Sequence, residues 1–371
     1  MKKIFSSIGL MSGTSGDGID GSIIQSDGEK KLIIKKNTFI EYKANMREEI
    51  RNLKEKINIL KDVTSYKKDI ETLEKKITYL NSDLIQKIIK ESKINLNSID
   101  VIGFHGQTIF HDPKNYYSKQ LGDGFLLSNI IKKKVVYDFR KNDLKNGGQG
   151  APLTPIYHDL IRTNFDLKVP VAFVNIGGIS NITYIDKNNK IFSFDTGPGN
   201  FLIDRVLQKH SNNKIQYDKD GEIAFKGKVN EIILETFLND PYYNLSPPKS
   251  LDVNDFNLSG IRGLSLPDSI ATLSELTTRT IFDSIKLYNN SSVKIILCGG
   301  GRKNKYIFQR LNKLSNGNTI NIDSLNIDGD FIESQAFAYL AIRLLEGMPI
   351  SFPSTTRCKT PSLGGVIVKN F

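Results

Sequence analysis

The stretch that decides the fold is Ser193-Phe194-Asp195-Thr196-Gly197-Pro198-Gly199-Asn200. An apolar run over 191–194 predicts a buried strand that ends in Asp195, and a tight Gly-Pro-Gly turn follows it directly. A ligand can approach the main chain at such a turn because glycine has no Cβ, and its peptide N–H groups can point together at an anion. The alternative is that Asp195 only caps the helix expected over 201–209.

The composition is that of a globular protein, with 371 residues, 39% hydrophobic and 25% charged. This length indicates two domains or one large bilobal unit. The formal net charge is +11, but the lysines are spread along the chain, so we expect no nucleic-acid partner. Cys298 and Cys358 lie far apart and no Cys/His cluster occurs, which argues against a structural zinc site and suits a reducing compartment.

We expect neither a membrane span nor a secretory signal. No apolar run approaches the ~18 residues that a transmembrane helix needs. The apolar stretch near the start is broken by Ser6, Ser7 and Gly9, and it is too short for a signal peptide. The expected location is therefore the cytoplasm.

A second glycine-rich turn, Met11-Ser12-Gly13-Thr14-Ser15-Gly16-Asp17-Gly18-Ile19-Asp20, lies between strands expected over 4–10 and 22–24. No Gly-Lys-Ser/Thr follows, so it is not a Walker loop. A phosphate could still bind the N–H and hydroxyl groups of this turn, and Asp17 and Asp20 could hold the accompanying magnesium. The alternative is a simple hairpin turn, for which Asp-Gly is favoured in any case.

A further strand is expected over 99–104, followed by His105-Gly106-Gln107-Thr108. In open αβ sheets, ligands bind at the carboxyl ends of the strands, so we expect His105, Gln107 and Thr108 to contact substrate. The alternative for His105 is a structural histidine with satisfied hydrogen bonds.

The second half of the chain resembles the first. A strand over 170–175, the turn Gly177-Gly178 and a hairpin over 180–194 repeat the opening pattern, and a later strand over 293–298 ends in Gly299-Gly300-Gly301 before a helix. We therefore expect an α/β fold of two similar domains that face one another across a nucleotide cleft. The expected limits are residues 1–150 plus 346–371 for one lobe and 151–345 for the other, with Gly147–Gly150 as a hinge. Helices are expected over 45–60, 68–93, 272–288 and 332–345.

The motifs together resemble those of the anhydro-N-acetylmuramic acid kinase family. The resemblance covers essentially the whole chain, and its motifs occur at 9–20, 105–108, 138–140 with 147–152, 175–181, 194–200, 298–301, 333–338 and 347–349. There are three departures from the usual family pattern. Position 16 is Gly instead of Leu, Leu251-Asp252-Val253-Asn254-Asp255 stands before Phe256 where Thr-Gly-Arg-Glu is usual, and Arg357-Cys358 replaces Gly-Ala.

The resemblance implies an actin-like ATPase fold, of the ribonuclease H-like type, and a cytoplasmic kinase of peptidoglycan recycling. Such enzymes use ATP and water to convert 1,6-anhydro-N-acetylmuramic acid into N-acetylmuramic acid 6-phosphate. The implied partners are the sugar, ATP and Mg²⁺, and a homodimer is the candidate assembly. By the same resemblance, Asp195 is the catalytic residue and Asn200 a substrate contact, and Glu333 joins Asp17 and Asp20 as a magnesium candidate. The expected ATP-binding residues are Gly13, Thr14, Ser15, Gly16, Asp17, Gly18, Ile19, Asp20, Gly177, Gly178, Gly197, Gly199, Gly299, Gly300 and Gly301.

Two other functions compete with this one. The first is a conventional kinase or phosphatase of the same fold that acts on another small metabolite. The second is a non-enzymatic ATP-binding switch or filament protein of the actin type. Strict dependence of ATP consumption on the anhydro sugar would separate the kinase from both.

Overall fold

The computed structural model describes residues 2–13, 16–251, 258–288 and 292–371. The chain divides into unit 1, Met1–Asp166 with Phe331–Phe371, and unit 2, Leu167–Asp330. These limits differ from the expected lobes because α6 (Pro155–Asn164) and α11 (Ile332–Leu345) pack against the unit 1 strands. Gly147–Gly150 therefore lies inside unit 1 and not at the point where the chain passes from one unit to the other.

Unit 1 is built on a mixed sheet. Its strands are β1 (Phe5–Ser12), β2 (Gly18–Ser26), β3 (Leu32–Glu41), β4 (Val101–Asp112), β5 (Tyr117–Leu121), β6 (Val135–Tyr137) and β12 (Val366–Val368). The order is β12-β6-β4-β1-β2-β3, with β5 paired to β4. β1 to β3 form an antiparallel meander, whereas β1, β4 and β6 run parallel.

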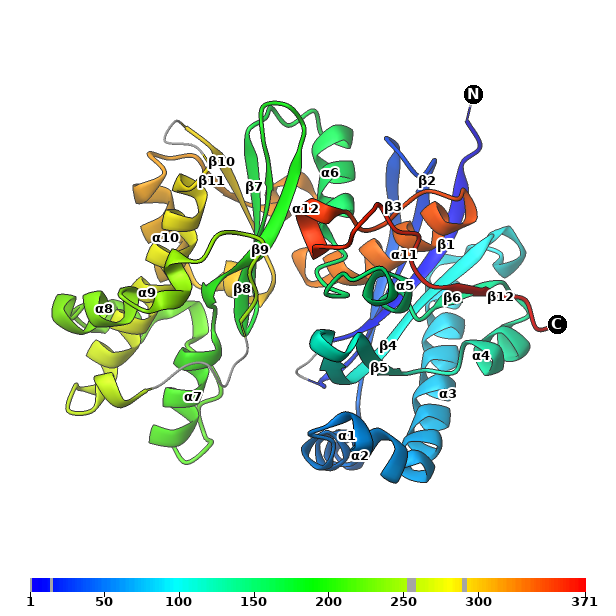
Figure 1. Ribbon diagram of the computed structural model, residues 1–371, viewed down its shortest axis with the longest axis horizontal. Coiled ribbons are helices and arrows are strands. Elements are labelled where there is room, and N and C mark those ends of the chain that lie inside the picture. Colours follow the sequence, from blue (N-terminus) through cyan, green and yellow to red (C-terminus); the bar gives the residue numbers. More distant parts are fainter. Residues whose placement is uncertain (1, 14–15, 252–257, 289–291) are drawn as a thin grey trace. The chain divides into compact units, whose positions relative to one another are not determined.

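Two glycines allow α11 to pack closely on this sheet. Gly9 of β1 and Gly103 of β4 are register partners. A Cβ on Gly9 would lie 1.9 Å from the Ser334 carbonyl oxygen, and one on Gly103 would lie 2.2 Å from the Phe337 carbonyl oxygen. Since no side chain fits between the strands and the helix backbone, these positions require glycine. Figure 1 shows α11 alongside β1 and β4.

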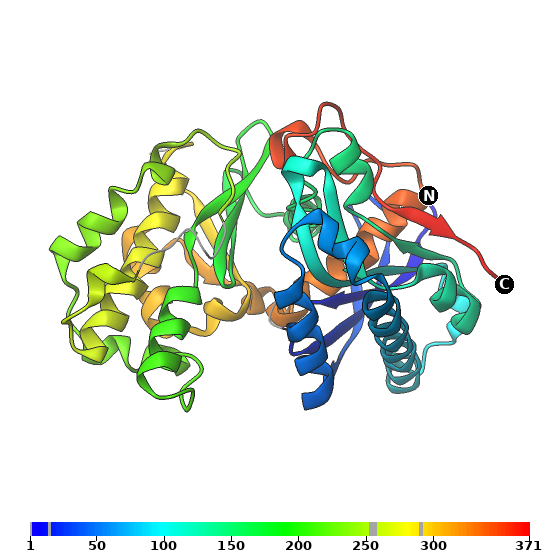
Figure 2. The same cartoon turned by 60° about the horizontal axis from the view of Figure 1, so that its bottom comes forward.

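The opposite face of the sheet is covered by α3 (Lys67–Ser92). Gly21 lies next to Leu10 in the β1–β2 ladder, and a Cβ there would meet Leu84 of α3 at 2.8 Å. The predicted apolar stripe of α3 is confirmed, since Ile70, Leu73, Ile77, Leu84 and Ile88 are buried and Leu80 packs beside them. Burial of each such side chain stabilises the fold by about 1.5–3 kcal/mol. α1 and α3 lie next to one another (Figure 2).

The remaining helices of unit 1 are mostly short. The helix expected over 45–60 is interrupted, because α1 ends at Lys56 and α2 begins at Leu60. Among the helices that the structure describes, none is both long and apolar enough to span a bilayer. The other helical bounds in unit 1 are α1 (Ala44–Lys56), α2 (Leu60–Ser65), α4 (Gly124–Ile131), α5 (Lys141–Lys145) and α12 (Pro353–Thr356).

Unit 2 repeats the strand order of unit 1. Its strands are β7 (Val171–Ile176), β8 (Ile179–Ile185), β9 (Ile191–Pro198), β10 (Lys294–Cys298) and β11 (Thr319–Asn321). The order is β11-β10-β7-β8-β9, with an antiparallel meander β7 to β9 and parallel pairing of β7, β10 and β11. This matches β6-β4-β1-β2-β3, so the α/β fold with two similar domains is confirmed.

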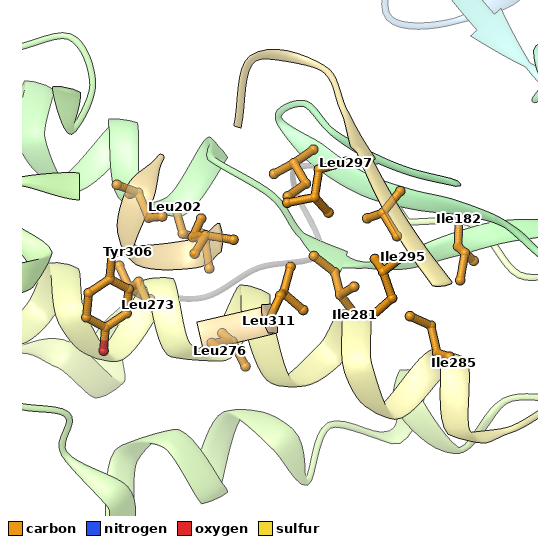
Figure 3. Packing of buried hydrophobic residues seen from close by; sticks show 14 of the residues in the cluster. Ile182, Leu202, Leu273, Leu276, Ile281, Ile285, Ile295, Leu297, Tyr306 and Leu311 are labelled. Carbon is orange, nitrogen blue, oxygen red and sulfur yellow. The ribbon is translucent and has the colours of Figure 1, made fainter. Parts of the chain in front are cut away.

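Helix α9 (Leu266–Lys286) organises the core of unit 2. Figure 3 shows Ile281 and Ile285 of α9 near Ile182 and Ile295 of the sheet. The helix begins at residue 266 and not at the expected residue 272. Ser265 caps its first turn by accepting a hydrogen bond from the Asp268 N–H. The other α-helices that the structure describes in this unit are α7 (Phe201–His210), α8 (Glu231–Leu238) and α10 (Lys305–Leu314).

Candidate active site

Asp195 lies within β9 at a β-bulge. The strand continues to Pro198 instead of ending at the acid. Asn181 of β8 pairs with Asp195 and the preceding Ser180 pairs with Gly197, which leaves Thr196 as an extra residue. Bulges bend a strand and re-aim its side chains, and they occur often beside active sites. The N-cap of α7 is Asn200, so the alternative role of Asp195 as the cap of that helix is wrong.

The Asp195 carboxyl group is unusually basic. Burial raises its pKa to about 6, and a hydrogen bond from the Leu251 N–H to Oδ2, at 2.9 Å, opposes part of that rise. A carboxylate with this pKa is largely ionised at neutral pH and still accepts a proton readily. Such a carboxylate can serve as a general base.

Two glycine turns of unit 2 contact each other beside Asp195. The Gly199 N–H donates to the Gly178 carbonyl at 2.9 Å, and the Asn200 N–H donates to the Gly177 carbonyl at 2.8 Å. A Cβ on Gly199 would lie 2.2 Å from the Gly177 oxygen, so this contact requires glycine. The structure thus brings the predicted turns together, but the two amides bond within the protein and do not face an anion.

The third glycine turn, Gly299-Gly300-Gly301, packs against Asn175, Ile176 and Asn200. Gly299 has φ +72°, and a Cβ there would lie 2.2 Å from Asn175 Oδ1. The Asn200 side chain reaches the Ile176 carbonyl from its Nδ2 at 3.3 Å, next to Gly301. Gly300, by contrast, has nothing within 4 Å of its Cβ position. The open main chain at Gly300 suits the close approach of a flat ring or a phosphate.

The Gly299 turn is anchored by Arg302, which sequence reasoning missed. Arg302 is 3% exposed and donates to the Gly299 carbonyl at 3.1 Å. It also pairs with Asp323 at 2.7 Å and with Asp330 at 2.6 Å. Its position after a Gly-Gly-Gly run was the available signal, but the two acids come from distant segments.

The predicted phosphate turn of unit 1 is described in part. Thr14 and Ser15 lie outside the described residues. The Gly16 N–H donates to the Gly13 carbonyl at 3.2 Å, and Gly16 has φ +69° with open space around it. Gln107 Nε2 also donates to the Gly13 carbonyl at 2.9 Å. Gln107 is buried and its Oε1 has no partner among the described residues.

The other predicted residues of this turn differ in exposure. A Cβ on Gly18 would collide with the Ile40 carbonyl, and Ile19 is fully buried in the core, so its side chain does not face a ligand. Asp17 is exposed, whereas Asp20 lies near Tyr42. Burial, with Asp20 adding to it, raises the pKa of Tyr42 to about 12.

The magnesium candidates do not form one cluster. Within the described part of the chain, no three His, Cys, Asp or Glu side chains gather as a metal site, so Asp17, Asp20 and Glu333 are not joint ligands. Glu333 lies in the first turn of α11. Burial raises its pKa and the nearby Arg140 opposes that rise.

His105 is held by Arg140. The β4 strand does not end at Phe104 but continues to Asp112, with a bulge at His105-Gly106 where Gly106 has φ +76°. His105 Nδ1 lies 2.8 Å from the Gly106 carbonyl, and Nε2 accepts from Arg140 Nη2 at 2.9 Å. Burial, and then Arg140, hold the pKa of His105 well below its ordinary value. Both ring nitrogens therefore bond within the protein.

Two more residues of unit 1 bear on the predictions for that unit. Thr108 Oγ1 accepts from Gln120 Nε2 at 3.3 Å and is partly exposed. Asp143, which sequence reasoning missed, is fully buried; its carboxylate accepts the Gly150 N–H and the Thr356 hydroxyl, both at 2.6 Å. Asp143 thus fixes the glycine segment that was expected to be a hinge.

Comparisons with known proteins agree with the motifs. A family model described as "Anhydro-N-acetylmuramic acid kinase" matches residues 5–370. A relative of that name from Pelagibacter ubique (strain HTCC1062) is 46% identical over 381 residues and covers 100% of both chains. One from Agrobacterium fabrum (strain C58 / ATCC 33970) is 36% identical over 374 residues, again with 100% coverage of both.

Among solved structures, an activator of the 2-hydroxyisocaproyl-CoA dehydratase from Clostridium difficile with bound ADPNP is similar, with a TM-score of 0.43 and 12% identity, over 92% of this chain and 96% of that chain. The family assignment rests instead on the family model and on the relatives that match end to end. They show that the chain belongs to the anhydro-N-acetylmuramic acid kinase family.

Proposed function

We propose that this protein is an ATP-dependent kinase of 1,6-anhydro-N-acetylmuramic acid. Its product would be N-acetylmuramic acid 6-phosphate. The observation that carries the proposal is Asp195, a basic carboxylate at a β-bulge beside three convergent glycine turns, in a chain of this family. The kinase activity itself follows the printed name of the relatives.

The substrate dictates what the base must do. In an anhydro sugar the 6-oxygen is locked in a bridge to C1 and carries no proton. Asp195 accepts a proton from water as the water oxygen bonds to C1, and the C1–O6 bond breaks. O6 takes the γ-phosphoryl group and ADP leaves. The proton on Asp195 then passes to solvent, so one water is consumed for each ATP.

The glycine turns suit a nucleotide substrate. Gly300 is exposed and leaves open main chain where a ligand can come close, and Gly178 has only a distant neighbour at 3.9 Å from its Cβ position. Gly16 is buried, but nothing lies within 4 Å of its Cβ position. Mg²⁺ prefers carboxylate oxygens and is usually held by one or two of them together with phosphates. Because the three candidates do not gather, a single carboxylate, that of Asp17, Asp20 or Glu333, would hold it together with the phosphates. It would neutralise charge on the transferring group.

Location and assembly belong to the same proposal. The reaction needs ATP, and Cys298 and Cys358 are buried free thiols, which fits the reducing cytoplasm. A homodimer is the assembly that we propose, and sedimentation equilibrium of the purified protein would measure it; a monomer at all concentrations would contradict it.

The test is ATP turnover with the anhydro sugar and with hydrated N-acetylmuramic acid, in ¹⁸O-labelled water. We expect ADP formation only with the anhydro sugar, and one labelled oxygen at C1 of the product. Phosphorylation of the hydrated sugar at a similar rate would indicate a conventional sugar kinase. ATP consumption without any sugar would indicate an ATP-binding switch.

A further inference from the structure

We propose that Lys249 and Tyr242 are positioning residues that hold the Asp195 carboxylate in its working position. They act through residues 242–251, here called the clamp segment. This inference rests on the proposed role of Asp195 as the base. Nothing in the sequence pattern of Asp195 itself points to either residue, since they are more than forty positions further along the chain.

The clamp segment contacts Asp195 on three of its polar groups. The Asp195 N–H donates to the Lys249 carbonyl at 2.9 Å. The Leu251 N–H donates to Asp195 Oδ2 at 2.9 Å, and the Tyr242 hydroxyl donates to the Asp195 carbonyl oxygen. Both the main chain and the carboxylate of Asp195 are therefore fixed by the same short segment.

The position of β9 explains why such a segment is needed. β9 is the last strand of the unit 2 sheet, so one side of it has no strand partner within the described part of the chain. The bulge at Thr196 also interrupts the ladder with β8 at this point. Main-chain groups at an edge and a bulge are satisfied by water or by another segment. Here the clamp segment satisfies those of Asp195 and fixes the direction of its side chain.

The Lys249 side chain joins the two ends of the clamp segment by hydrogen bonds. Its side chain is 5% exposed, and its Nζ donates to the Tyr242 carbonyl at 3.0 Å and to the Tyr243 carbonyl at 3.1 Å. The same Nζ lies 4.6 Å from the centre of the Tyr242 ring. Within the described ranges, no carboxylate lies at salt-bridge distance from it. A buried ammonium must be satisfied by hydrogen bonds, so the two carbonyls and the ring hold Tyr242 close to Lys249.

The consequence is a chain of contacts that ends at the reacting group. The Lys249 ammonium holds Tyr242, while the Lys249 carbonyl, the Tyr242 hydroxyl and the next residue but one, Leu251, hold Asp195. Loss of the ammonium should loosen both ends of the segment together. The Leu251 N–H would then no longer stabilise the ionised carboxylate, and the pKa of Asp195 should rise.

The experiment compares two variants with two matched controls. Lys249→Met keeps the apolar stem and removes the charge, and Tyr242→Phe removes only the hydroxyl. Tyr243→Phe is the control for the hydroxyl. Lys286→Met is the control for the ammonium, since Lys286 also lies 4.6 Å from an aromatic ring, that of Phe282, but is exposed. Thermal unfolding of each variant checks that it is folded.

Two readouts are used, and one does not need activity. The pH dependence of kcat is measured between pH 4.5 and 9. The pKa of the Asp195 carboxyl is measured by NMR on protein labelled with ¹³C-aspartate, its resonance assigned by its absence in Asp195→Asn. We expect kcat at pH 7 to fall about tenfold in Lys249→Met and about threefold in Tyr242→Phe, because misplacement of a catalytic group is costly. The pH at which kcat falls on the acid side of its profile (the acid limb) should move to higher pH, and the pKa of the Asp195 carboxyl should rise with it. Both changes should be about one pH unit in Lys249→Met.

The outcomes separate this inference from the proposed function. If Lys249→Met and Tyr242→Phe are folded but both the acid limb and the carboxyl pKa stay in place, the positioning role is wrong. If Lys249→Met does not fold, Tyr242→Phe alone decides in the same way. If Asp195→Asn keeps its turnover and its acid limb, the proposed base is wrong. The NMR measurement still tests the clamp segment in that case.

Discussion

Asp195→Asn should make the protein more stable above pH 6 while it removes most of the activity. The asparagine has nearly the same size and keeps an oxygen that can accept the Leu251 N–H, but it carries no charge. In the folded chain the pKa of Asp195 lies at about 6, above the ordinary value of 3.8. Between these two values the native state binds more protons than the unfolded state, so the stability of the native protein falls as the pH rises through this window.

The size of the effect follows from the same shift. A difference of about two pKa units corresponds to roughly 3 kcal/mol of stability above pH 6, and we expect the measured gain to be on the order of 2–3 kcal/mol. For a unit of this size, that amounts to an increase of about 4–12 °C in Tm. Below pH 3.8 the aspartate is mostly protonated in both states, so most of the gain should disappear.

Differential scanning calorimetry at pH 8 and at pH 3.5 measures this directly. The control is Asp186→Asn, which changes an acid in the β8–β9 turn of the same unit. Turnover of Asp195→Asn should fall by about 10²–10⁴, the usual effect of removing a general base. A Tm gain of the same size at both pH values, or no gain at pH 8, would refute the burial argument. Unchanged turnover would refute the catalytic role.

Three further predictions concern the supporting residues. His105→Phe should cost about 1.5–3 kcal/mol in thermal unfolding because Arg140 loses its acceptor, whereas His105→Gln should recover most of it; equal losses would contradict the pairing. Asp143→Ala should cost about 2–4 kcal/mol because it removes the acceptor of two buried donors, and a cost under 1 kcal/mol would speak against the contacts. Gly199→Ala should destabilise unit 2 by more than about 2 kcal/mol. Gly300→Ala should change stability by less than about 0.5 kcal/mol and instead raise the KM for ATP; the opposite order would refute the glycine assignments.

The fold could be predicted from local patterns because its main signals are local. The stripe of α3, the limits of α11 and the repeated strand–glycine turn–hairpin unit each follow from residues close together in the sequence. The bulges at His105-Gly106 and at Thr196 could not be predicted. Both β4 and β9 continue past the residue where the apolar run stops, because the polar side chains there bond across the sheet or to the clamp segment. Such contacts depend on partners that the local pattern does not contain.

Sequence reasoning found the site residues that belong to a local run of glycines and acids. It missed the residues whose hydrogen-bond or ion-pair partners are remote in sequence. Asp195 and the three glycine turns belong to the first kind. Arg302, Asp143 and Lys249 belong to the second, because each has a partner that is remote in sequence: Asp323 and Asp330 for Arg302, Thr356 for Asp143 and Asp195 for Lys249. A side chain whose function is to hold another leaves a weak signal, because a buried Lys or Arg resembles a solvated one until its surroundings are known.

The three departures from the family pattern follow the same logic. Leu251 contributes its main-chain N–H to Asp195, so the identity of its side chain matters little for that contact. Gly16 has φ +69° with open space around it, a conformation that glycine adopts more readily than the usual leucine. Arg357 has φ +62° at the end of α12, where the usual glycine would be unstrained, so here the departure costs roughly 1 kcal/mol. The cost falls on α12, a short helix of unit 1.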